Sequence, residues 1–460
     1  MQKLPLITHT EFDQAIAWRN DKPIPVQQFL KDVTLLAAAL PAGQHILNVC
    51  RDRYHFAVGF AAALLSNKVS LLPPTHTSEM VQQIKTFAND VFCLHDNPDC
   101  DIALPKLLYP VLSEDLKSSI DSDLIASDLK VPLIDIGQLA AIVFTSGSTG
   151  TPVPHRKSWG SLVRNVQAQA KRLKLDSQTH YTVLGTIPPQ HMYGFESTVL
   201  LPMQSGNALS SEQPFYPADI AAALTKITGN RMLVSTPLHL RLLLDAELAL
   251  PELSLVLSAT APLSTALANK TEMLLKAPLL EIYGSTETGQ IATRRTTETE
   301  QWQLLPSVHL TARDERYWAD GGHIETSVPL NDVIELLDKD HFILQGRMQD
   351  IVNIAGKRSS IANLDYHLNS VAGVTDGAFF MPDEQSHDHV TRLCACVVAP
   401  SLSPAQILAE LRTRIDPVFL PRPLLFVESL PRNSTGKLPR SALQKLIDEQ
   451  MRPNEEACRP

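Results

Sequence analysis

Residues 140–152 read Ala-Ala-Ile-Val-Phe-Thr-Ser-Gly-Ser-Thr-Gly-Thr-Pro, an apolar run that leads directly into a loop of small and hydroxylated residues. The run Ala140–Thr145 has the length and composition of a buried strand. Glycines allow a tight turn that brings backbone N–H groups close to an anion, and hydroxyls add further donors. The loop therefore predicts a phosphate site rather than a flexible linker. It is not a Walker A loop, because no Gly-Lys-Ser/Thr follows.

Strand-like and helix-like patterns alternate on both sides of this loop. We expect strands at His45–Cys50, Val69–Leu72, Val91–Leu94, Thr182–Ile187, Met232–Ser235, Leu253–Leu257 and Leu279–Ile282. Helical spacing is found at Tyr54–Ser66 and Ser78–Asn89. This alternation predicts an α/β fold with doubly wound parallel sheets. Because ligands bind where the strands of such sheets end, the loops after the strands are the first place to look for a site.

The pattern changes near Arg294. Short strands are expected at Trp302–Leu310, His323–Ser327, Val333–Leu337 and His341–Leu344, joined by tight turns such as Asp320-Gly321-Gly322. This spacing predicts an antiparallel β meander. A smaller α+β unit follows. We therefore expect an N-terminal domain over residues 1–345 and a C-terminal domain over residues 346–460.

Composition excludes several classes of protein. The net charge of the 460 residues is −9, and the charges are interspersed, which argues against a nucleic-acid-binding protein. The six cysteines form no C-x-x-C pair, so they are expected to be free thiols in a reducing compartment. Residues Met1–Asp13 contain no apolar core of the kind found in signal peptides, and the longest apolar stretch, Phe56–Leu65, is too short to span a bilayer. A cytoplasmic protein without a membrane span is expected.

Two further segments contain residues suited to nucleotide chemistry. Residues 283–289, Tyr-Gly-Ser-Thr-Glu-Thr-Gly, follow the predicted strand Leu279–Ile282. Alone they are either an ordinary turn or a site in which the ring stacks on a base and the carboxylate binds Mg²⁺. Residues 431–440, Pro-Arg-Asn-Ser-Thr-Gly-Lys-Leu-Pro-Arg, place a lysine in a glycine-containing loop. That lysine is either solvated or able to stabilise charge on phosphate.

In this order, the three segments resemble the adenylate-forming (AMP-binding) superfamily. This group contains acyl- and aryl-CoA synthetases, firefly luciferase and the adenylation domains of peptide synthetases. The resemblance extends from about His45 to Lys437, and the chain is most similar to short stand-alone acyl or aryl ligases. It implies a large N-terminal adenylation domain and a mobile C-terminal lid that turns about a hinge near Gln349.

The resemblance also implies a set of nucleotide ligands. The loop that holds the β and γ phosphates matches Thr145, Ser146, Gly147, Ser148, Thr149 and Gly150. Tyr283, followed by Gly284 and Ser285, matches the aromatic residue that stacks on the base, and Ala261-Pro262 matches the segment beside adenine. Thr286 matches the α-phosphate ligand and Glu287 the Mg²⁺ ligand. Ribose-side positions correspond to Asp332 and Arg347, and the step after the hinge contains Arg358.

The remaining site assignments concern the acid and the chemical step. Lys437 matches the lysine that orients the carboxylate and the α-phosphate. His191 matches a residue that gates the carboxylate site, although a structural histidine is the alternative. By loop position alone, further candidates for the acid pocket are Ser235, Ala259, Thr260 and Ile282.

The sequence departs from the family pattern at several positions. Val153 stands where the family usually has a lysine after the phosphate loop, and Lys157 or Arg156 is a candidate to supply that charge. Ala259-Thr260 replaces the usual Gly-Gly. The usual hinge aspartate and a nearby lysine are replaced by Gln349 and Asn353.

The resemblance implies a two-step reaction. ATP, with Mg²⁺, activates a carboxylic acid, aryl or medium-chain acyl, as acyl-AMP with release of pyrophosphate. The acyl group then passes to a phosphopantetheine thiol of CoA or of an acyl carrier protein. Two alternatives remain open: an adenylating enzyme with a non-thiol acceptor, and a nucleotide-binding homologue with little catalysis.

Overall fold

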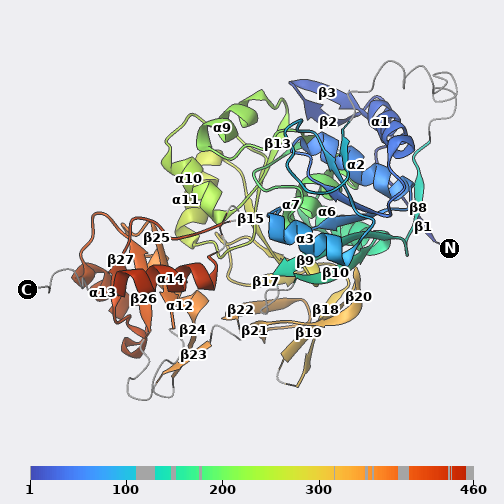
Figure 1. Cartoon of the computed structure of the whole chain (residues 1–460). Coiled ribbons are helices and arrows are strands. Elements are labelled where there is room, and N and C mark those ends of the chain that lie inside the picture. The colour runs from blue at the N-terminus through green and yellow to red at the C-terminus, as the bar shows by residue number, and fades with distance from the viewer. Residues whose placement is uncertain are drawn as a thin grey trace, which may run out of the picture.

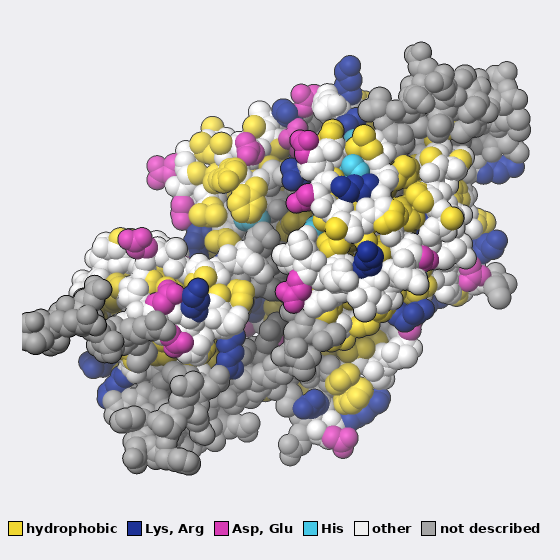
Figure 2. All heavy atoms as spheres, viewed as in Figure 1, with side chains coloured by type: hydrophobic (Ala, Val, Ile, Leu, Met, Phe, Trp, Pro, Cys, Tyr) yellow, Lys and Arg dark blue, Asp and Glu magenta, His cyan; other side chains and the backbone are white. Residues whose placement is uncertain are grey.

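Two β-sheets form the larger body of the molecule, and a smaller body contains the C-terminal end (Figure 1). The computed structural model describes residues 2–109, 130–146, 152–175, 179–314, 316–347, 351–354, 357–381, 393–433, 436 and 438–451. On the face drawn in Figure 2, basic and acidic side chains are interspersed.

The first sheet contains six strands in the order β10-β9-β5-β4-β6-β7. They are β4 (His45–Asn48), β5 (Val69–Leu72), β6 (Phe92–His95), β7 (Lys106–Leu108), β9 (Leu139–Ser146) and β10 (Pro152–Ser158). All neighbours are parallel except β10, which is antiparallel to β9. The predicted phosphate loop therefore joins the two strands of a hairpin. The helices α2 (Arg53–Leu65) and α3 (Ser78–Phe87) lie close to the predicted ranges.

The second sheet contains eleven strands in the order β21-β22-β17-β16-β15-β14-β13-β11-β12-β2-β3. Its parallel centre consists of β11 (Tyr181–Gly185), β12 (Ala208–Ser210), β13 (Asn230–Ser235), β14 (Leu255–Ser258) and β15 (Leu279–Ser285). Antiparallel strands continue it on one side: β16 (Gly289–Arg294), β17 (Trp302–Leu304), β21 (Asp332–Leu336) and β22 (His341–Arg347). On the other side lie β2 (Ala15–Arg19) and β3 (Lys22–Pro25). Helices α9 (Pro217–Lys226), α10 (Pro237–Asp245) and α11 (Thr265–Leu275) connect the central strands.

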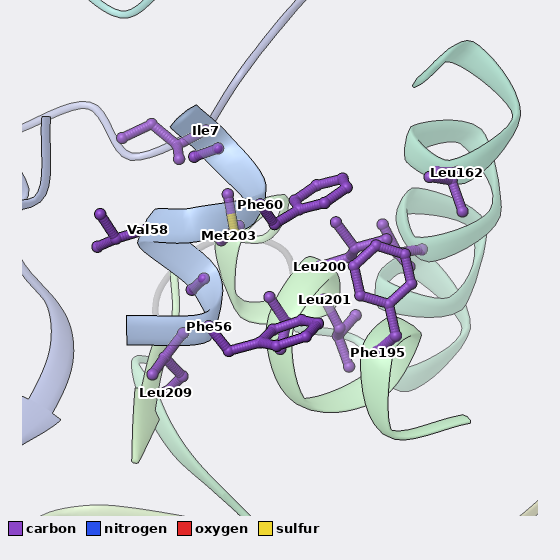
Figure 3. Packing of buried hydrophobic residues seen from close by; sticks show 14 of the residues in the cluster. Ile7, Phe56, Val58, Phe60, Leu162, Phe195, Leu200, Leu201, Met203 and Leu209 are labelled. Carbon is purple, nitrogen blue, oxygen red and sulfur yellow. The ribbon is translucent and has the colours of Figure 1, made fainter. Parts of the chain in front are cut away.

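Helix α2 lies in the core between the two sheets. It contacts β4 and β5 of the first sheet and β12 of the second. Phe56 and Phe60 on α2 pack edge-on against Phe195, with ring centroids 6.2 and 4.8 Å apart (Figure 3). Leu162 of α6 (Trp159–Leu173) lies in the same cluster. A helix that is apolar on every side is expected only where it is buried all round, and α2 meets that condition.

The meander was predicted correctly in outline and wrongly in one detail. The strands β18 (Val308–Arg313), β19 (Arg316–Gly321) and β20 (Ile324–Pro329) form a separate antiparallel sheet. The predicted strand Trp302–Leu310 is divided into β17 and β18. Pro306 and Ser307, which has φ +64°, form the turn that separates them. The first helix, α1 (Val26–Ala39), and the early strands were not predicted.

The C-terminal part has its own hydrophobic clusters. The hairpin β23 (Ile351–Ile354) and β24 (Lys357–Ser360) leads into α12 (Ile361–Asn369). The sheet of β25 (Asp376–Phe380), β26 (Cys394–Val398) and β27 (Leu424–Phe426) packs with α12, α13 (Pro404–Arg412) and α14 (Arg440–Met451). Both clusters consist of residues from 352 onwards. Among the helices described anywhere in the chain, none has the length and hydrophobicity needed to cross a membrane.

Candidate functional site

The predicted phosphate loop and the Tyr283 segment are brought together by His155. The first segment connects β9 to β10 and the second connects β15 to β16, and each of these pairs of strands is antiparallel. His155 Nε2 lies 2.9 Å from Thr145 Oγ1 and 3.6 Å from Glu287 Oε1. The imidazole therefore links the first residue of the phosphate loop to the predicted Mg²⁺ ligand. Burial lowers the pKa of His155, and the charge of Glu287 acts in the opposite direction.

The turn after Tyr283 is held by its own hydroxyls. The Ser285 N–H donates to Thr288 Oγ1 (3.1 Å), and the Thr288 N–H donates to Ser285 Oγ (3.2 Å). This arrangement leaves the side chains of Thr286 and Glu287 partly exposed, with the Glu287 side chain at 40%. Mg²⁺ is usually bound through one or two carboxylates together with substrate phosphates. The accessible Glu287 carboxylate, linked through His155 to Thr145, fits that pattern.

Tyr283 and Asp332, 49 residues apart, form one unit. The Tyr283 hydroxyl donates to Asp332 Oδ2 at 2.6 Å, and the Tyr283 ring lies 5.6 Å from the ring centroids of Trp302 and Phe342. Asp332 on β21 is the strand partner of Arg347 on β22. The structure thus brings together the positions expected to bind the base and the ribose.

The segment expected beside adenine is held through Glu281. Leu263 N–H donates to Glu281 Oε1 at 3.2 Å, and Glu281 Oε2 accepts from Arg294 Nε at 2.6 Å. Ala261 is half-buried and Pro262 is exposed, so both are accessible to a ligand. Thr260 has φ +78°, in the left-handed region, where glycine is the usual residue.

His191 is the N-cap residue of helix α7 (Met192–Phe195), in the loop that follows β11. Its Nδ1 accepts from the Tyr193 N–H at 3.3 Å, so the neutral ring has its proton on Nε2. The loop is packed closely: a Cβ on Gly194 would lie 2.1 Å from the Pro188 carbonyl oxygen. His191 is therefore an N-cap as well as a candidate for the acid pocket.

The structure separates the predicted pocket residues into two groups. The Ser235 hydroxyl lies 3.0 Å from that of Thr186, which also contacts His239 Nδ1 on α10 at 2.7 Å. Ala259 and Ile282 belong instead to the core cluster on the other face of the sheet. The candidates were chosen because they lie at or near the ends of strands. Position in the sequence did not distinguish the two groups, because a residue at the end of a strand can face either side of the sheet.

Tyr193 was missed by the sequence reasoning. It belongs to the same cluster as Ala259 and Ile282 and is buried, and its hydroxyl has no hydrogen-bond partner among the described residues. Burial raises the pKa of Tyr193. Its position two residues after His191 was the available signal.

The candidates to replace the missing lysine lie in different places. Val153 is 44% exposed on β10, at the end of the phosphate loop. Arg156 is exposed, and Lys157 is buried with its Nζ donating to the Glu287 carbonyl at 3.0 Å. The ammonium of Lys157 thus lies beneath the Thr286–Glu287 turn.

Several predicted residues lie outside the described part of the chain. These are the loop residues Gly147, Ser148, Thr149 and Gly150, the hinge residue Gln349 and the catalytic lysine Lys437. The side chains of Ser146, Arg347 and Arg358 are likewise not described, although their strands are.

The residue before Lys437 is described and has two neighbours of interest. Gly436 lies close to Leu238 of α10, and its carbonyl accepts from Arg432 Nη1 at 3.0 Å. Arg432 in turn makes a bidentate ion pair with Asp376 at 2.7 and 2.8 Å. This pair anchors one end of the lysine loop to strand β25.

Comparison with known proteins identifies the family of the chain. The profile of the AMP-binding enzyme family matches residues 13–341. The 4-coumarate–CoA ligase of Halorhodospira halophila is 32% identical over 303 residues, covering 64% of this chain and 73% of that protein. The 2,3-dihydroxybenzoate-AMP ligase of Bacillus subtilis is 22% identical over 372 residues, covering 72% and 68%.

Solved structures share the fold over nearly the whole chain. ATP-bound MatB from Rhodopseudomonas palustris has a TM-score of 0.78 at 16% identity, covering 96% of this chain and 97% of that one. The o-succinylbenzoate CoA synthetase MenE of Bacillus subtilis, in complex with its acyl-adenylate intermediate, also has a TM-score of 0.78 at 16% identity, covering 96% and 99%. By its family profile, its relatives and its fold, the chain belongs to the AMP-binding enzymes of the adenylate-forming superfamily.

Proposed function

We propose that this protein is an AMP-forming acid–thiol ligase. In the first step a carboxylate oxygen attacks the α-phosphorus of ATP, the bond to the β-phosphate oxygen breaks, and pyrophosphate leaves with the electron pair. In the second step a phosphopantetheine thiol attacks the acyl carbon, AMP leaves, and the thiol proton is released. A carboxylate is a poor electrophile, and the anhydride with AMP supplies a good leaving group.

The contact between Tyr283 and Asp332 is the observation that best supports this proposal. It joins a ring suited to stacking on a base with a carboxylate suited to ribose hydroxyls, and the ring lies three residues before Thr286 in the chain. Thr286 donates to the α-phosphate in this scheme, and the Thr145 loop holds the outer phosphates. Mg²⁺, held by Glu287 and the phosphates, would neutralise the charge that develops on the leaving pyrophosphate.

The second step requires that Lys437 leave the path of the thiol. We propose that residues 346–460 are a lid that turns about Gln349 for this purpose. The separate hydrophobic clusters of the C-terminal part support this idea, because a unit with its own core can move as a body.

We further propose that the acid is an aryl acid with a hydrogen-bonding group on its ring. Two relatives are named for 4-coumarate and 2,3-dihydroxybenzoate. The Tyr193 hydroxyl has no partner among the described residues, and Ala259 and Ile282 are apolar members of the same cluster. A site built to hydrogen-bond a substrate hydroxyl rejects the analogue without it by a factor of about 10⁴–10⁵ at most.

ATP–pyrophosphate exchange with matched acids tests the proposal. We expect 4-coumarate to support exchange better than cinnamate, which lacks the ring hydroxyl, and better than octanoate. Tyr193→Phe should reduce the ratio between the first two acids and leave the rate with cinnamate nearly unchanged. Equal rates with both aryl acids, or a preference for octanoate, would refute the assignment of the acid.

The acceptor is tested separately. AMP release from the preformed adenylate is measured with CoA, with a phosphopantetheinylated carrier protein, and with water alone. Acceleration by one of the thiols supports a ligase. Adenylate that forms but does not react with either thiol would favour a non-thiol acceptor, and the absence of exchange with every acid would favour a binding protein.

A further inference from the structure

Three buried side chains hold the Thr286–Gln290 turn from beneath. Lys157 Nζ donates to the Glu287 carbonyl at 3.0 Å, His323 Nε2 to the Thr288 carbonyl at 2.9 Å, and Asn165 Nδ2 to the Gln290 carbonyl at 3.2 Å. The donors come from β10, from the turn before β20 and from α6. All three are buried, the most exposed being Lys157 at 6%. Buried side-chain donors therefore hydrogen-bond to the backbone of the turn that presents the predicted nucleotide ligands.

Lys157, Asn165 and His323 line a small cavity beside the turn. Among the described residues that line this cavity, only Glu196 has a carboxylate. Glu196 is 2% exposed and opens a short π-helical turn, Glu196–Leu200, after α7. Gln290 Nε2 donates to Glu196 Oε2 at 3.3 Å, while Oε1 has no hydrogen-bond partner in the described part of the chain. The cavity that Glu196 shares with Lys157 is too small for a water molecule. Lys157, which lines the same cavity, carries the positive charge that acts on Glu196.

The two buried charges affect each other in the expected directions. Burial raises the pKa of Glu196 to about 7, and the charge of Lys157 opposes that shift. Burial lowers the pKa of Lys157, and the charges of Glu196, Glu287 and Glu325 oppose it. Removing Lys157 would leave Glu196 without the positive charge that opposes the effect of its burial, which is costly.

Gly289 allows the turn to pack closely against these buried polar side chains. It has φ +71°, and a Cβ there would lie 2.5 Å from Asn165 Nδ2 and 3.1 Å from Glu196 Oε1. The backbone of the turn therefore approaches these polar groups more closely than any residue with a side chain would permit. Gly289 thus places the turn that contains Thr286 and Glu287 directly against Asn165 and Glu196.

We propose that Lys157, with Glu196 as its buried counter-charge, is a positioning residue that fixes the nucleotide turn through the Glu287 carbonyl. In this role it does not contact the outer phosphates, although it is close in sequence to the missing lysine of the phosphate loop. Lys157 acts instead on the orientation of Thr286, which faces the α-phosphate in the proposed function. The inference rests on the proposed function only in assuming that the turn binds the α-phosphate.

Binding of AMP and of ATP separates the two roles of Lys157. AMP lacks the β and γ phosphates but has the phosphate that Thr286 would bind. We expect Lys157→Met to weaken both nucleotides by a similar factor of about ten, because one charge-assisted hydrogen bond to the turn is lost. Calorimetry measures both affinities without an acid, so the result remains valid if the exchange assay fails. Arg164→Met, which alters an exposed side chain on α6, is the control and should bind both nucleotides as the unaltered protein does.

A second variant separates positioning from loss of stability. Lys157→Met leaves Glu196 unpaired and should unfold at a lower temperature, whereas Lys157→Met with Glu196→Gln should recover most of the melting temperature. Nucleotide affinity should stay low in the double variant, because the Glu287 carbonyl still lacks its donor. Weakened ATP binding with unchanged AMP binding would assign Lys157 to the outer phosphates. Unchanged binding of both nucleotides, or affinity restored together with stability, would also overturn the proposal.

Discussion

Arg53 provides the sharpest test of how the two sheets are joined. It is fully buried at the start of α2, and its guanidinium donates to four carbonyls: Gly185 and Ile187 at 3.0 Å, Ser210 at 3.3 Å and Glu212 at 2.6 Å. These carbonyls lie at the ends of β11 and β12 in the second sheet, while α2 follows β4 of the first sheet. Burial lowers the pKa of Arg53 to about 10, so the side chain remains charged at neutral pH.

Replacing Arg53 by Met keeps much of the volume and removes every donor. Each buried carbonyl left without a partner costs about 1 kcal/mol at the low end of its range, or about 4 kcal/mol for the four. Removing the buried charge also removes its desolvation cost, which offsets part of this loss of stability. We therefore expect Arg53→Met to lower the free energy of unfolding by about 3 kcal/mol.

Urea unfolding followed by far-UV circular dichroism measures the effect. Arg51, two residues earlier, has an exposed side chain. Arg51→Met is therefore the matched control and should change the free energy of unfolding by less than about 0.5 kcal/mol. Arg53→Lys should recover little, because one ammonium cannot reach four carbonyls in two directions. An Arg53→Met protein as stable as the control would refute the view that this side chain links the sheets.

Three further predictions concern the lysine, the hinge and pH. Lys437→Ala should slow adenylate formation by about 10²–10³-fold and spare thioester formation from preformed acyl-AMP, and an equal loss in both half-reactions would contradict its assigned role. Gln349→Pro, which fixes φ near −65°, should leave pyrophosphate exchange near normal and reduce acyl transfer sharply; a melting-temperature measurement controls for misfolding, and equal effects on both steps would argue against a hinge there. Burial lowers the pKa of His9 to about 4. Below about pH 6.5 the unfolded chain therefore takes up a proton that the native ring does not. The free energy of unfolding should fall for this reason by about 2 kcal/mol between pH 7 and pH 5. His9→Gln, which keeps a donor for the Asn207 carbonyl, should lose this part of the pH dependence, and an identical stability profile for both proteins would show that His9 does not cause it.

Periodicity predicted the central strands well because their buried side chains leave a clear pattern. Val69–Leu72 was predicted to the residue, and Leu279 was the correct start of β15. The prediction stopped at Ile282, whereas β15 continues to Ser285 and pairs with β16. Glycine and hydroxyl residues indicate a turn in sequence, yet here they form the end of a strand whose pairing is decided by residues downstream.

The polar groups beneath the site could not be located from sequence. Lys157 and Glu196 lie 39 positions apart, and only the folded chain brings them to the lining of one cavity. Glu196 stands between Phe195 and a run ending in Val199-Leu200-Leu201, so a carboxylate within an apolar segment was the available signal. Tyr283 and Asp332 were each assigned to the nucleotide by resemblance, but their mutual hydrogen bond depends on the strand order β15-β16-β17-β22-β21.

The buried cysteines determine which reagents can follow acyl transfer. Cys50, Cys93, Cys394 and Cys396 are buried, and burial raises the pKa of Cys394 to about 12 and of Cys396 to about 11. At pH 8 such groups supply almost no thiolate, so they neither intercept an activated acyl group nor react quickly with a disulfide or maleimide. Cys100 is half-buried, and Cys458 lies outside the described residues. With these two replaced by serine, a chromogenic disulfide added to the native protein would report the consumption of the acceptor's sulfhydryl with little background from the enzyme.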